Sequence, residues 1–277
     1  MKIGIQGILG SFHDAAAASY FKDKKYEVMP FSGFRDLAKA LSKKSLDYGV
    51  MAIENTIAGS ILPNYALLNE YGLEVSGEVY SRIELSFLVN RGVSIDEITQ
   101  VRSHPMALLQ SADYLNNYQK IKIVESEDTA DSAKAIKSEK LNHVAAIASK
   151  RAGELFDLDV LAENIETNRL NYTRFLIVNG KMNGNGQLKE KASLRLITGH
   201  KPGSLADVLT VFKDFKINLT KIQSMPIVGE PYNYAFNLDL VWEAYEDYKK
   251  ALIEINSISS EVKILGEYTK GMMPITR

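Results

Sequence analysis

The sequence predicts an α/β protein in which a two-lobed N-terminal domain precedes a smaller domain of βαββαβ order. Strand-like apolar runs alternate with helix-like runs over residues 1–180, which is the pattern of an α/β domain with a parallel sheet. A polar run rich in glycine and asparagine follows at 180–190 and predicts a linker. Over residues 191–277 the runs follow the order strand, helix, strand, strand, helix, strand.

The composition is that of an ordinary globular protein. The chain has 277 residues and a net charge of −1, so no overall basic charge predicts nucleic acid or membrane as a partner. Cysteine is absent, which excludes disulfides and thiolate chemistry. The four histidines are scattered, and no metal site or cofactor is predicted. The N-terminus begins as a strand and no apolar run approaches the ~20 residues of a membrane span, so we expect a cytoplasmic protein.

The first lobe is predicted from a regular alternation of elements. Strands are expected at 2–6, 27–31 and 48–53, and helices at 12–21, 34–41 and 60–70. A glycine turn at 7–11 either simply connects strand and helix or offers the free N–H groups of the helix start to an anion. Glu54, Asn55 and Thr56 follow the third strand, at the edge of the sheet where α/β folds bind ligands.

The second lobe is predicted over about 76–164, so that lobe one comprises about 1–75 and 165–180. A strand-rich run leads into it, and helix caps are expected at Ser94, Asp128 and Ser149. Either Ser103 or His104 is expected to cap a helix that begins at Pro105, with Leu109 among its inward residues. Because the chain crosses between the lobes, we expect a ligand-binding cleft between them.

The stretch Asn168–Val178 returns the chain to lobe one. Thr173 and Arg174 stand side by side at the start of an apolar run, Phe175 to Val178, that predicts a buried strand. In the C-terminal domain, strands are expected at 192–197, 219–224, 232–241 and 262–268, and helices at 204–215 and 245–255. That domain shows no acid–base constellation, which favours a regulatory or structural role.

At these residues the chain resembles prephenate dehydratases that carry a C-terminal ACT domain. The resemblance covers essentially the whole chain. Its motifs are Gly7–Phe12, Ile53–Thr56 with Gly59 and Ser60, Ser103–Pro105, Gln110, Asp128–Ala133, Asn171–Phe175, Pro202–Leu205 and Ile222–Pro226. Each motif alone is weak, whereas their shared order along one chain is a specific signal.

The resemblance implies a periplasmic-binding-protein-like catalytic domain at 1–180 and an ACT regulatory domain at 191–277. It also implies the decarboxylative dehydration of prephenate to phenylpyruvate in L-phenylalanine biosynthesis. Aromatisation of the ring supplies the driving force of this reaction. The enzyme therefore needs to hold a dianion and assist departure of the hydroxyl, without a metal or another cofactor.

The resemblance assigns roles to individual residues. Thr173 matches the family's proposed proton donor to the leaving hydroxyl, and a concerted hydrogen bond is expected because threonine is a poor acid. Arg174 offers a guanidinium to a substrate carboxylate, although neighbours on a regular strand face opposite sides. Glu54 is expected either to relay a proton or to make a structural hydrogen bond. The other residues assigned to the substrate cleft are Asn55, Thr56, Ser103 and Gln110.

Departures from the family pattern leave the substrate open. Ile8 replaces a proline, His13 a small hydroxyl residue and Met106 a glutamine. Arogenate, the amino analogue of prephenate, therefore remains an alternative substrate. A non-catalytic, two-lobed small-molecule-binding protein remains the alternative from another class, because fold does not fix function.

The resemblance further implies phenylalanine as an effector, bound between paired ACT domains of a homodimer or homotetramer. The residues assigned to that site are Gly203, Ser204, Leu205, Gln223 and Ser224. Gln223 and Met225 replace a glutamate and an arginine of the family motif. Because the glycine turn and the flanking strands are intact, we expect phenylalanine to bind and inhibit. A chain ending near Gly180 is expected to keep its turnover and to ignore phenylalanine.

Overall fold

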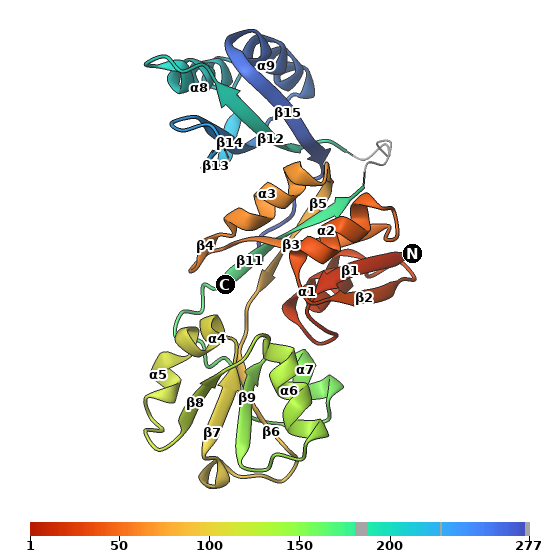
Figure 1. The fold of residues 1–277 in the computed structure, drawn as a ribbon, viewed down its shortest axis with the longest axis vertical. Helices are drawn as coiled ribbons and strands as arrows, with labels where there is room; N and C mark the ends of the chain where they lie inside the picture. The colour runs from red at the N-terminus through yellow and green to blue at the C-terminus, as the bar shows by residue number, and fades with distance from the viewer. Residues whose placement is uncertain (181–187, 228, 275–277) are drawn as a thin grey trace.

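The computed structural model describes residues 1–180, 188–227 and 229–274, and most of the predicted linker at 180–190 lies outside these ranges. Three units follow one another along the length of the molecule (Figure 1). The C-terminal domain packs against lobe one, and lobe two lies at the opposite end. In the described ranges, no helix is long and apolar enough to cross a membrane.

Lobe one is built on a mixed sheet in the order β2-β1-β3-β11-β5, with β4 paired to β3. Strands β2 and β3 run parallel to β1, as the alternating pattern predicts. Strand β11 is antiparallel to both of its neighbours because it enters the sheet from the side of lobe two. The elements are β1 (Lys2–Gln6), α1 (Phe12–Tyr20), β2 (Glu27–Phe31), α2 (Phe34–Ser42), β3 (Tyr48–Asn55), β4 (Gly59–Ser60), α3 (Leu62–Glu70), β5 (Glu74–Arg82) and β11 (Tyr172–Asn179).

Lobe two is a second α/β unit with the strand order β10-β6-β9-β7-β8. Its elements are β6 (Ser86–Val89), a 3-10 helix η1 (Ile95–Glu97), β7 (Gln100–Ser103), α4 (Pro105–Gln110), α5 (Ala112–Leu115), β8 (Lys122–Glu125), α6 (Thr129–Ser138), β9 (Val144–Ala148), α7 (Lys150–Leu155) and β10 (Asp159–Ala162). Strand β9 is buried throughout and is paired to β6 and β7, so it forms the middle of the lobe.

The crossing between the lobes lies later in the chain than the sequence suggested. Strand β5 belongs to the sheet of lobe one as far as Arg82, so the chain crosses at 83–85 and not near 75. Neither glycine nor proline separates β5 from β6. The apolar pattern of the sequence therefore continues from β5 into β6 without a turn signal. Only the pairing of β5 with β11 identifies the boundary between the lobes.

The predicted helix starts agree with the local geometry. Ser94 forms a capping box with Glu97, and the side chains of Asp128 and Ser149 accept backbone N–H groups at the starts of α6 and α7. His104 caps α4, since its side chain accepts from the N–H of Met106. The prediction that Leu109 points inward is wrong, because its side chain is 68% exposed.

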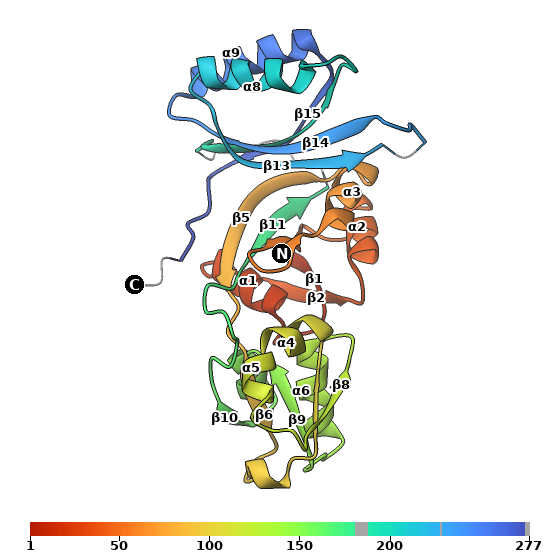
Figure 2. The same cartoon turned by 90° about the vertical axis from the view of Figure 1, so that its left-hand side faces the viewer.

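The C-terminal domain has the predicted βαββαβ order and the sheet order β13-β14-β12-β15. Helices α8 and α9 cover one face of the sheet, and the other face lies over lobe one (Figure 2). All strand pairs in this sheet are antiparallel. The elements are β12 (Lys191–Thr198), α8 (Ser204–Asp214), β13 (Asn218–Pro226), β14 (Tyr234–Val241), α9 (Tyr245–Ile258) and β15 (Ser259–Tyr268).

The two domains share part of a hydrophobic core. Leu265 and Tyr268 of β15 are buried in the same cluster as Leu176 and Val178 of β11. A Cβ atom on Gly266 would lie 1.9 Å from the carbonyl oxygen of Val75, so glycine is needed for the close approach of β15 to β5. Removing the C-terminal domain would expose this apolar surface. The shared core therefore argues against the expectation that a chain ending near Gly180 keeps its turnover.

Candidate active site

A cavity of about 250 Å³ lies between the two lobes. Lobe one supplies side chains from the end of β3, from the start of α1 and from β11, and lobe two supplies side chains from α4 and its cap and from the start of α6. The lining residues are Gln6, Ser11, Phe12, His13, Ala52, Asn55, Ala58, Ile61, Ile83, Leu85, His104, Met106, Ala107, Gln110, Glu127, Asp128, Thr129, Thr173 and Phe175. A cavity of this size between two lobes suits a small metabolite.

The strand pair β3–β11 brings two polar side chains to the cavity. Thr173 stands opposite Asn55 in the pairing register, and both residues line the cavity. The register then shifts, so Phe175 stands opposite Ala52, and these two residues also line the cavity. This irregularity in β3 keeps Asn55 and Ala52 on one face although three positions separate them.

Asn55 orients the hydroxyl of Thr173. The Oδ1 atom of Asn55 accepts the backbone N–H groups of Ile57 and Ala58, each at 2.9 Å. Because a backbone N–H can only donate, these bonds determine which side of the amide is oxygen. The Nδ2 atom then donates to Thr173 Oγ1 at 3.0 Å. Thr173 accepts this bond, and its own proton is left to point toward a ligand.

Asn171 extends this network to lobe two. Its Oδ1 atom accepts from Asn55 Nδ2 at 2.8 Å, and its Nδ2 atom donates to Gln110 Oε1 at 2.9 Å. Asn171 is completely buried, so both bonds satisfy groups that would otherwise be costly to bury. The network therefore links Gln110 on α4 to Thr173 on β11 through neutral amides.

Helix starts supply much of the polar character of the remaining wall. Ser11 caps α1, and Asp128 caps α6 by accepting from the N–H groups of Ala130 and Asp131. Both caps line the cavity, and the first N–H groups of a helix favour negative charge. His104 Nδ1 accepts from a backbone N–H, so the neutral imidazole carries its proton on Nε2.

The described cavity wall contains acidic side chains but neither lysine nor arginine. Glu127 and Asp128 both belong to it, and burial raises the pKa of the Asp128 carboxyl. An anionic ligand would consequently depend on helix starts, amides and hydroxyls, because no cationic side chain of the described residues lines the cavity. A raised pKa also makes protonation of Asp128 easier when an anion binds.

His13 is a neutral, aromatic part of the wall. Burial lowers its pKa to about 3, and its Nε2 atom is buried without a hydrogen-bond partner among the described residues. Its ring makes an edge contact with Phe175 at 5.0 Å and a tilted contact with Phe34 at 5.3 Å. His13 therefore contributes shape and packing to the cavity without adding a charge.

Two polar contacts hold the lobes together beside the cavity. Arg151 on α7 donates from Nε to Asp14 on α1 at 2.8 Å. Ser149 donates to the carbonyl oxygen of Gly10 at 2.7 Å. Asp14 also accepts the N–H of Gly10 at 2.9 Å, so the glycine turn before α1 is tied to lobe two. The cavity is thereby defined by both lobes together.

Four residues that the sequence assigned to the substrate lie away from the cavity wall. Arg174 is buried against Glu78 and Asp239 on the opposite face of the sheet, and Glu54 pairs with Lys221 of the C-terminal domain. Arg174 faces this way because it follows Thr173 on a strand whose successive side chains alternate. The structure therefore corrects the assignment of a substrate carboxylate to Arg174.

Thr56 and Ser103 satisfy the backbone near the cavity. Thr56 Oγ1 donates to the carbonyl oxygen of Leu170 and accepts from the N–H of Tyr172. Ser103 is completely buried and donates to the carbonyl oxygen of Ile147 at 2.5 Å. Of the predicted catalytic and substrate residues, the structure brings together Thr173, Asn55 and Gln110 at the cavity.

The sequence did not single out some residues that the structure places at the site. Asn171 lies two positions before Thr173 in the same motif, and that position was the available signal. Phe175 was interpreted as part of a buried strand, and Asp128 as a helix cap. Both descriptions are correct, but the three-dimensional arrangement also places these side chains on the cavity wall. A local pattern carries no information about that second contact.

The predicted effector residues occupy two separate segments of the C-terminal domain. Gly203 precedes α8 with φ of 89°, a left-handed conformation that favours glycine, and Ser204 begins the helix. Gln223 and Ser224 lie on β13, which is an edge strand of its sheet. An edge strand and a helix start both leave backbone groups available to a ligand or a partner.

Comparisons with known proteins agree over nearly the whole chain. The sequence model of the family described as prephenate dehydratase matches residues 3–183. The bifunctional chorismate mutase/prephenate dehydratase of Escherichia coli (strain K12) is 33% identical, over 99% of this chain and 72% of that protein. The chloroplastic arogenate dehydratase/prephenate dehydratase 2 of Arabidopsis thaliana is 32% identical, over 97% and 72%. The crystal structure of prephenate dehydratase from Staphylococcus aureus has a TM-score of 0.84 at 27% identity, covering 97% of this chain and 100% of that chain.

Proposed function

The chain belongs to the prephenate dehydratase family and is therefore a lyase that converts prephenate to phenylpyruvate, carbon dioxide and water, and we propose that Thr173 is its catalytic donor. The observation that carries this proposal is the hydrogen bond from Asn55 to Thr173 Oγ1 at the wall of the interlobe cavity. It orients the hydroxyl and leaves its proton for the substrate.

The reaction needs one positioned donor and a site that holds the substrate. The bond between the ring and its carboxylate breaks, and the electron pair enters the ring. The bond from the ring to the hydroxyl breaks at the other end, and the departing oxygen takes up one proton, which comes in the net reaction from the solvent, to become water. Thr173 hydrogen-bonds that oxygen as its negative charge develops, which is where a donor lowers the barrier most.

The substrate is a dianion, and we propose that the starts of α1 and α6 hold its carboxylates. Phe12 of α1 and Thr129 of α6, whose backbone N–H groups are not used by the caps, line the cavity beside Ser11 and Asp128. Neutral His104 and Gln110 add side-chain donors to the same wall. The apolar side chains of Phe175, Ile83 and Leu85 then provide a surface for the ring.

Arogenate is a second candidate substrate, and one observation favours it. The described wall carries the carboxylates of Glu127 and Asp128 and no cationic side chain. Arogenate carries the same two carboxylates as prephenate and, in addition, an ammonium group that such a wall would attract. The values of kcat/KM for prephenate and arogenate, measured side by side, decide between them.

The test of the proposed function is a direct assay of purified protein with prephenate. Phenylpyruvate is followed by its absorbance in alkali, and we expect steady formation by the wild-type protein. A protein that binds prephenate without forming phenylpyruvate would instead support the non-catalytic alternative.

We propose that phenylalanine binds the C-terminal domain as an ACT-type effector and that the protein is a homodimer or homotetramer. The glycine turn at Gly203 and the exposed edge strand that carries Gln223 and Ser224 support this proposal. Titration calorimetry of the full chain with phenylalanine, combined with sedimentation analysis, tests it. If no heat of binding is measured at millimolar phenylalanine, the C-terminal domain has only a structural role.

A further inference from the structure

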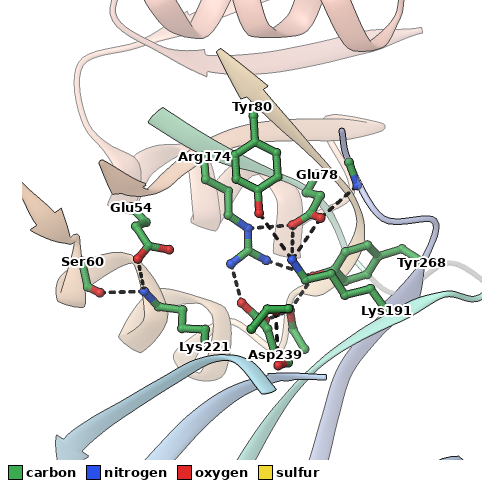
Figure 3. A network of polar contacts seen from close by, with 12 residues as sticks. Glu54, Ser60, Glu78, Tyr80, Arg174, Lys191, Lys221, Asp239 and Tyr268 are labelled. Atoms are coloured by element: carbon green, nitrogen blue, oxygen red, sulfur yellow. Dashed lines mark hydrogen bonds and ion pairs between the residues drawn. The ribbon is translucent and has the colours of Figure 1, made fainter. Parts of the chain in front are cut away.

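Buried charged side chains join the C-terminal domain to the face of β3 and β11 that lies opposite the cavity (Figure 3). Arg174 donates from Nε to Glu78 at 2.6 Å and forms an ion pair with Asp239 of β14. Lys191 of β12 donates from Nζ to both carboxylate oxygens of Glu78, at 3.0 and 2.9 Å. Tyr268 of β15 accepts a further bond from Arg174 at 3.2 Å.

A second, partly exposed ion pair between the same two domains lies beside the first (Figure 3). Lys221 of β13 pairs with Glu54 of β3 at 2.9 Å and donates to Ser60 at 2.8 Å. Lys221 stands opposite Asp239 in the pairing of β13 with β14, and Glu54 stands opposite Arg174 in the pairing of β3 with β11. Two cross-strand pairs from different domains therefore face each other with complementary charges.

The two charged residues on β3 and β11, Glu54 and Arg174, each have a sequence neighbour at the cavity wall. Glu54 precedes Asn55 on β3, and Arg174 follows Thr173 on β11. Successive side chains of a strand point to opposite faces, so one register pair meets the C-terminal domain and the next meets the cavity. A displacement of the Glu54–Arg174 pair consequently displaces the Asn55–Thr173 pair, because the backbone between them is one peptide unit.

The network is built to hold one geometry. The side chains of Arg174, Glu78, Asp239 and Lys191 are at most 4% exposed, and their two positive and two negative charges balance. Burial alone would raise the pKa of Asp239, but the Arg174 guanidinium outweighs it and holds that pKa below its usual value. Moving one partner of a buried ion pair costs much free energy, because the other charge is left uncompensated.

We propose that Arg174 and Glu54 are positioning residues, through which Asp239 and Lys221 of the C-terminal domain hold Thr173 and Asn55 in their catalytic arrangement. The proposal rests on the proposed function of Thr173. In this proposal Arg174 and Glu54 maintain the positions of Thr173 and Asn55 and do not bind the substrate. It also provides a physical connection by which a change in the C-terminal domain alters the rate at the cavity.

The test compares turnover by full-length variants. Asp239→Asn keeps the shape of the side chain and removes the charge that Arg174 needs, at a position that does not line the cavity. We expect kcat per folded molecule to fall roughly ten- to a hundredfold, since a small displacement of a catalytic group has such effects. KM for prephenate should stay unchanged, because no group that contacts substrate has been altered.

Two further variants keep the test informative. Tyr268→Phe removes only the hydroxyl that contacts Arg174 and Ser193, so it is expected to lower kcat less than Asp239→Asn. It serves as the test if Asp239→Asn folds poorly. Lys263→Met is the matched control, because Lys263 makes an exposed hydrogen bond to Asn69 across the same domain boundary. The control is expected to retain the kcat and KM of the wild-type protein.

The outcomes separate this proposal from the proposed function. A wild-type protein that forms no phenylpyruvate contradicts the proposed function itself. If the wild-type protein is active and both Asp239→Asn and Tyr268→Phe keep its kcat, or if KM alone rises, positioning is contradicted. Amide hydrogen exchange gives a reading independent of turnover: residues 53–56 and 171–175 should exchange faster in Asp239→Asn and at the wild-type rate in Lys263→Met. Unchanged exchange in Asp239→Asn would also contradict the proposal.

Discussion

The two faces of the β3–β11 strand pair carry different kinds of polar group. On the cavity face, Asn55 and Thr173 form hydrogen bonds between neutral groups, and no lysine or arginine of the described residues lines the wall. On the face toward the C-terminal domain, Glu54 and Arg174 form ion pairs with side chains of the other domain. The two faces are separated by a single step along each strand.

The difference shows how one strand lines the cavity and holds the domain interface at once. A neutral amide orients a hydroxyl without attracting a counter-ion, which keeps the donor available to the substrate. Ion pairs between domains give a strong and directional attachment when they are buried and fully paired. The charges therefore hold the strands, and the neutral groups line the cavity.

The largest effect is expected when the interface face is broken. Arg174→Met leaves Glu78 and Asp239 without their shared partner in a buried site, which should lower the free energy of unfolding by about 3–5 kcal/mol. The matched control Arg35→Met removes an arginine from the exposed pair with Glu70 and should cause no measurable change. Urea denaturation measures both variants. If the Arg174→Met protein has wild-type stability and only its KM is raised, Arg174 binds the substrate after all.

The next effect is expected on the cavity face. Thr173→Val is nearly isosteric and replaces the hydroxyl, which accepts from Asn55 and donates toward the cavity, with a methyl group, so turnover should fall by roughly 10²–10³ while the fold is retained. Thr210→Val makes the same replacement on an exposed face of α8 and should keep wild-type turnover. Steady-state kinetics, with circular dichroism as the check on folding, give the comparison. Near-normal turnover by a folded Thr173→Val protein would contradict the proposal that Thr173 is the catalytic donor.

A smaller effect is expected on the pH dependence of the free energy of unfolding, because His13 is buried as a neutral ring in the cavity wall. The pKa of His13 falls from 6.5 to about 3 in the folded protein because the ring is buried. The unfolded chain takes up this proton as pH falls through 6.5, whereas the folded protein does not, so the stabilisation present above pH 6.5 is lost toward pH 3. Between pH 7 and pH 5 this loss amounts to about 2 kcal/mol.

The control for this prediction is His13→Gln, which cannot titrate. The difference in unfolding free energy between the wild-type protein and His13→Gln, measured by urea denaturation at several pH values, isolates the contribution of His13. A difference that does not change between pH 7 and pH 5 would show that His13 is protonated with its ordinary pKa in the folded protein.

The smallest effect is expected from chelators. The described residues contain no cluster of three histidine, aspartate or glutamate side chains that could hold a metal ion. We expect the turnover of prephenate in EDTA to equal that in its absence. Loss of turnover in EDTA that one divalent ion restores would show that the neutral donors of the cavity are insufficient.

Much of the fold follows from local patterns in the sequence. The alternation of strands and helices predicts lobe one, and the βαββαβ order predicts the C-terminal domain. Caps such as Asp128 and Ser149 mark helix starts because their oxygens satisfy nearby backbone N–H groups. The location of Thr173 at the start of a buried strand was also visible, since the apolar run begins beside it.

Other features depend on contacts between distant segments. The lobe boundary at 83–85 is set by the pairing of β5 with β11, and the orientation of Asn55 by backbone groups and by Asn171, 116 positions along the chain. The sequence indicated that Thr173 and Arg174 face opposite sides if their strand is regular, but it still assigned Arg174 to the substrate. Only the tertiary structure decided which side is the cavity and which is the C-terminal domain, because Asp239 reaches Arg174 across 65 positions once the two sheets pack together.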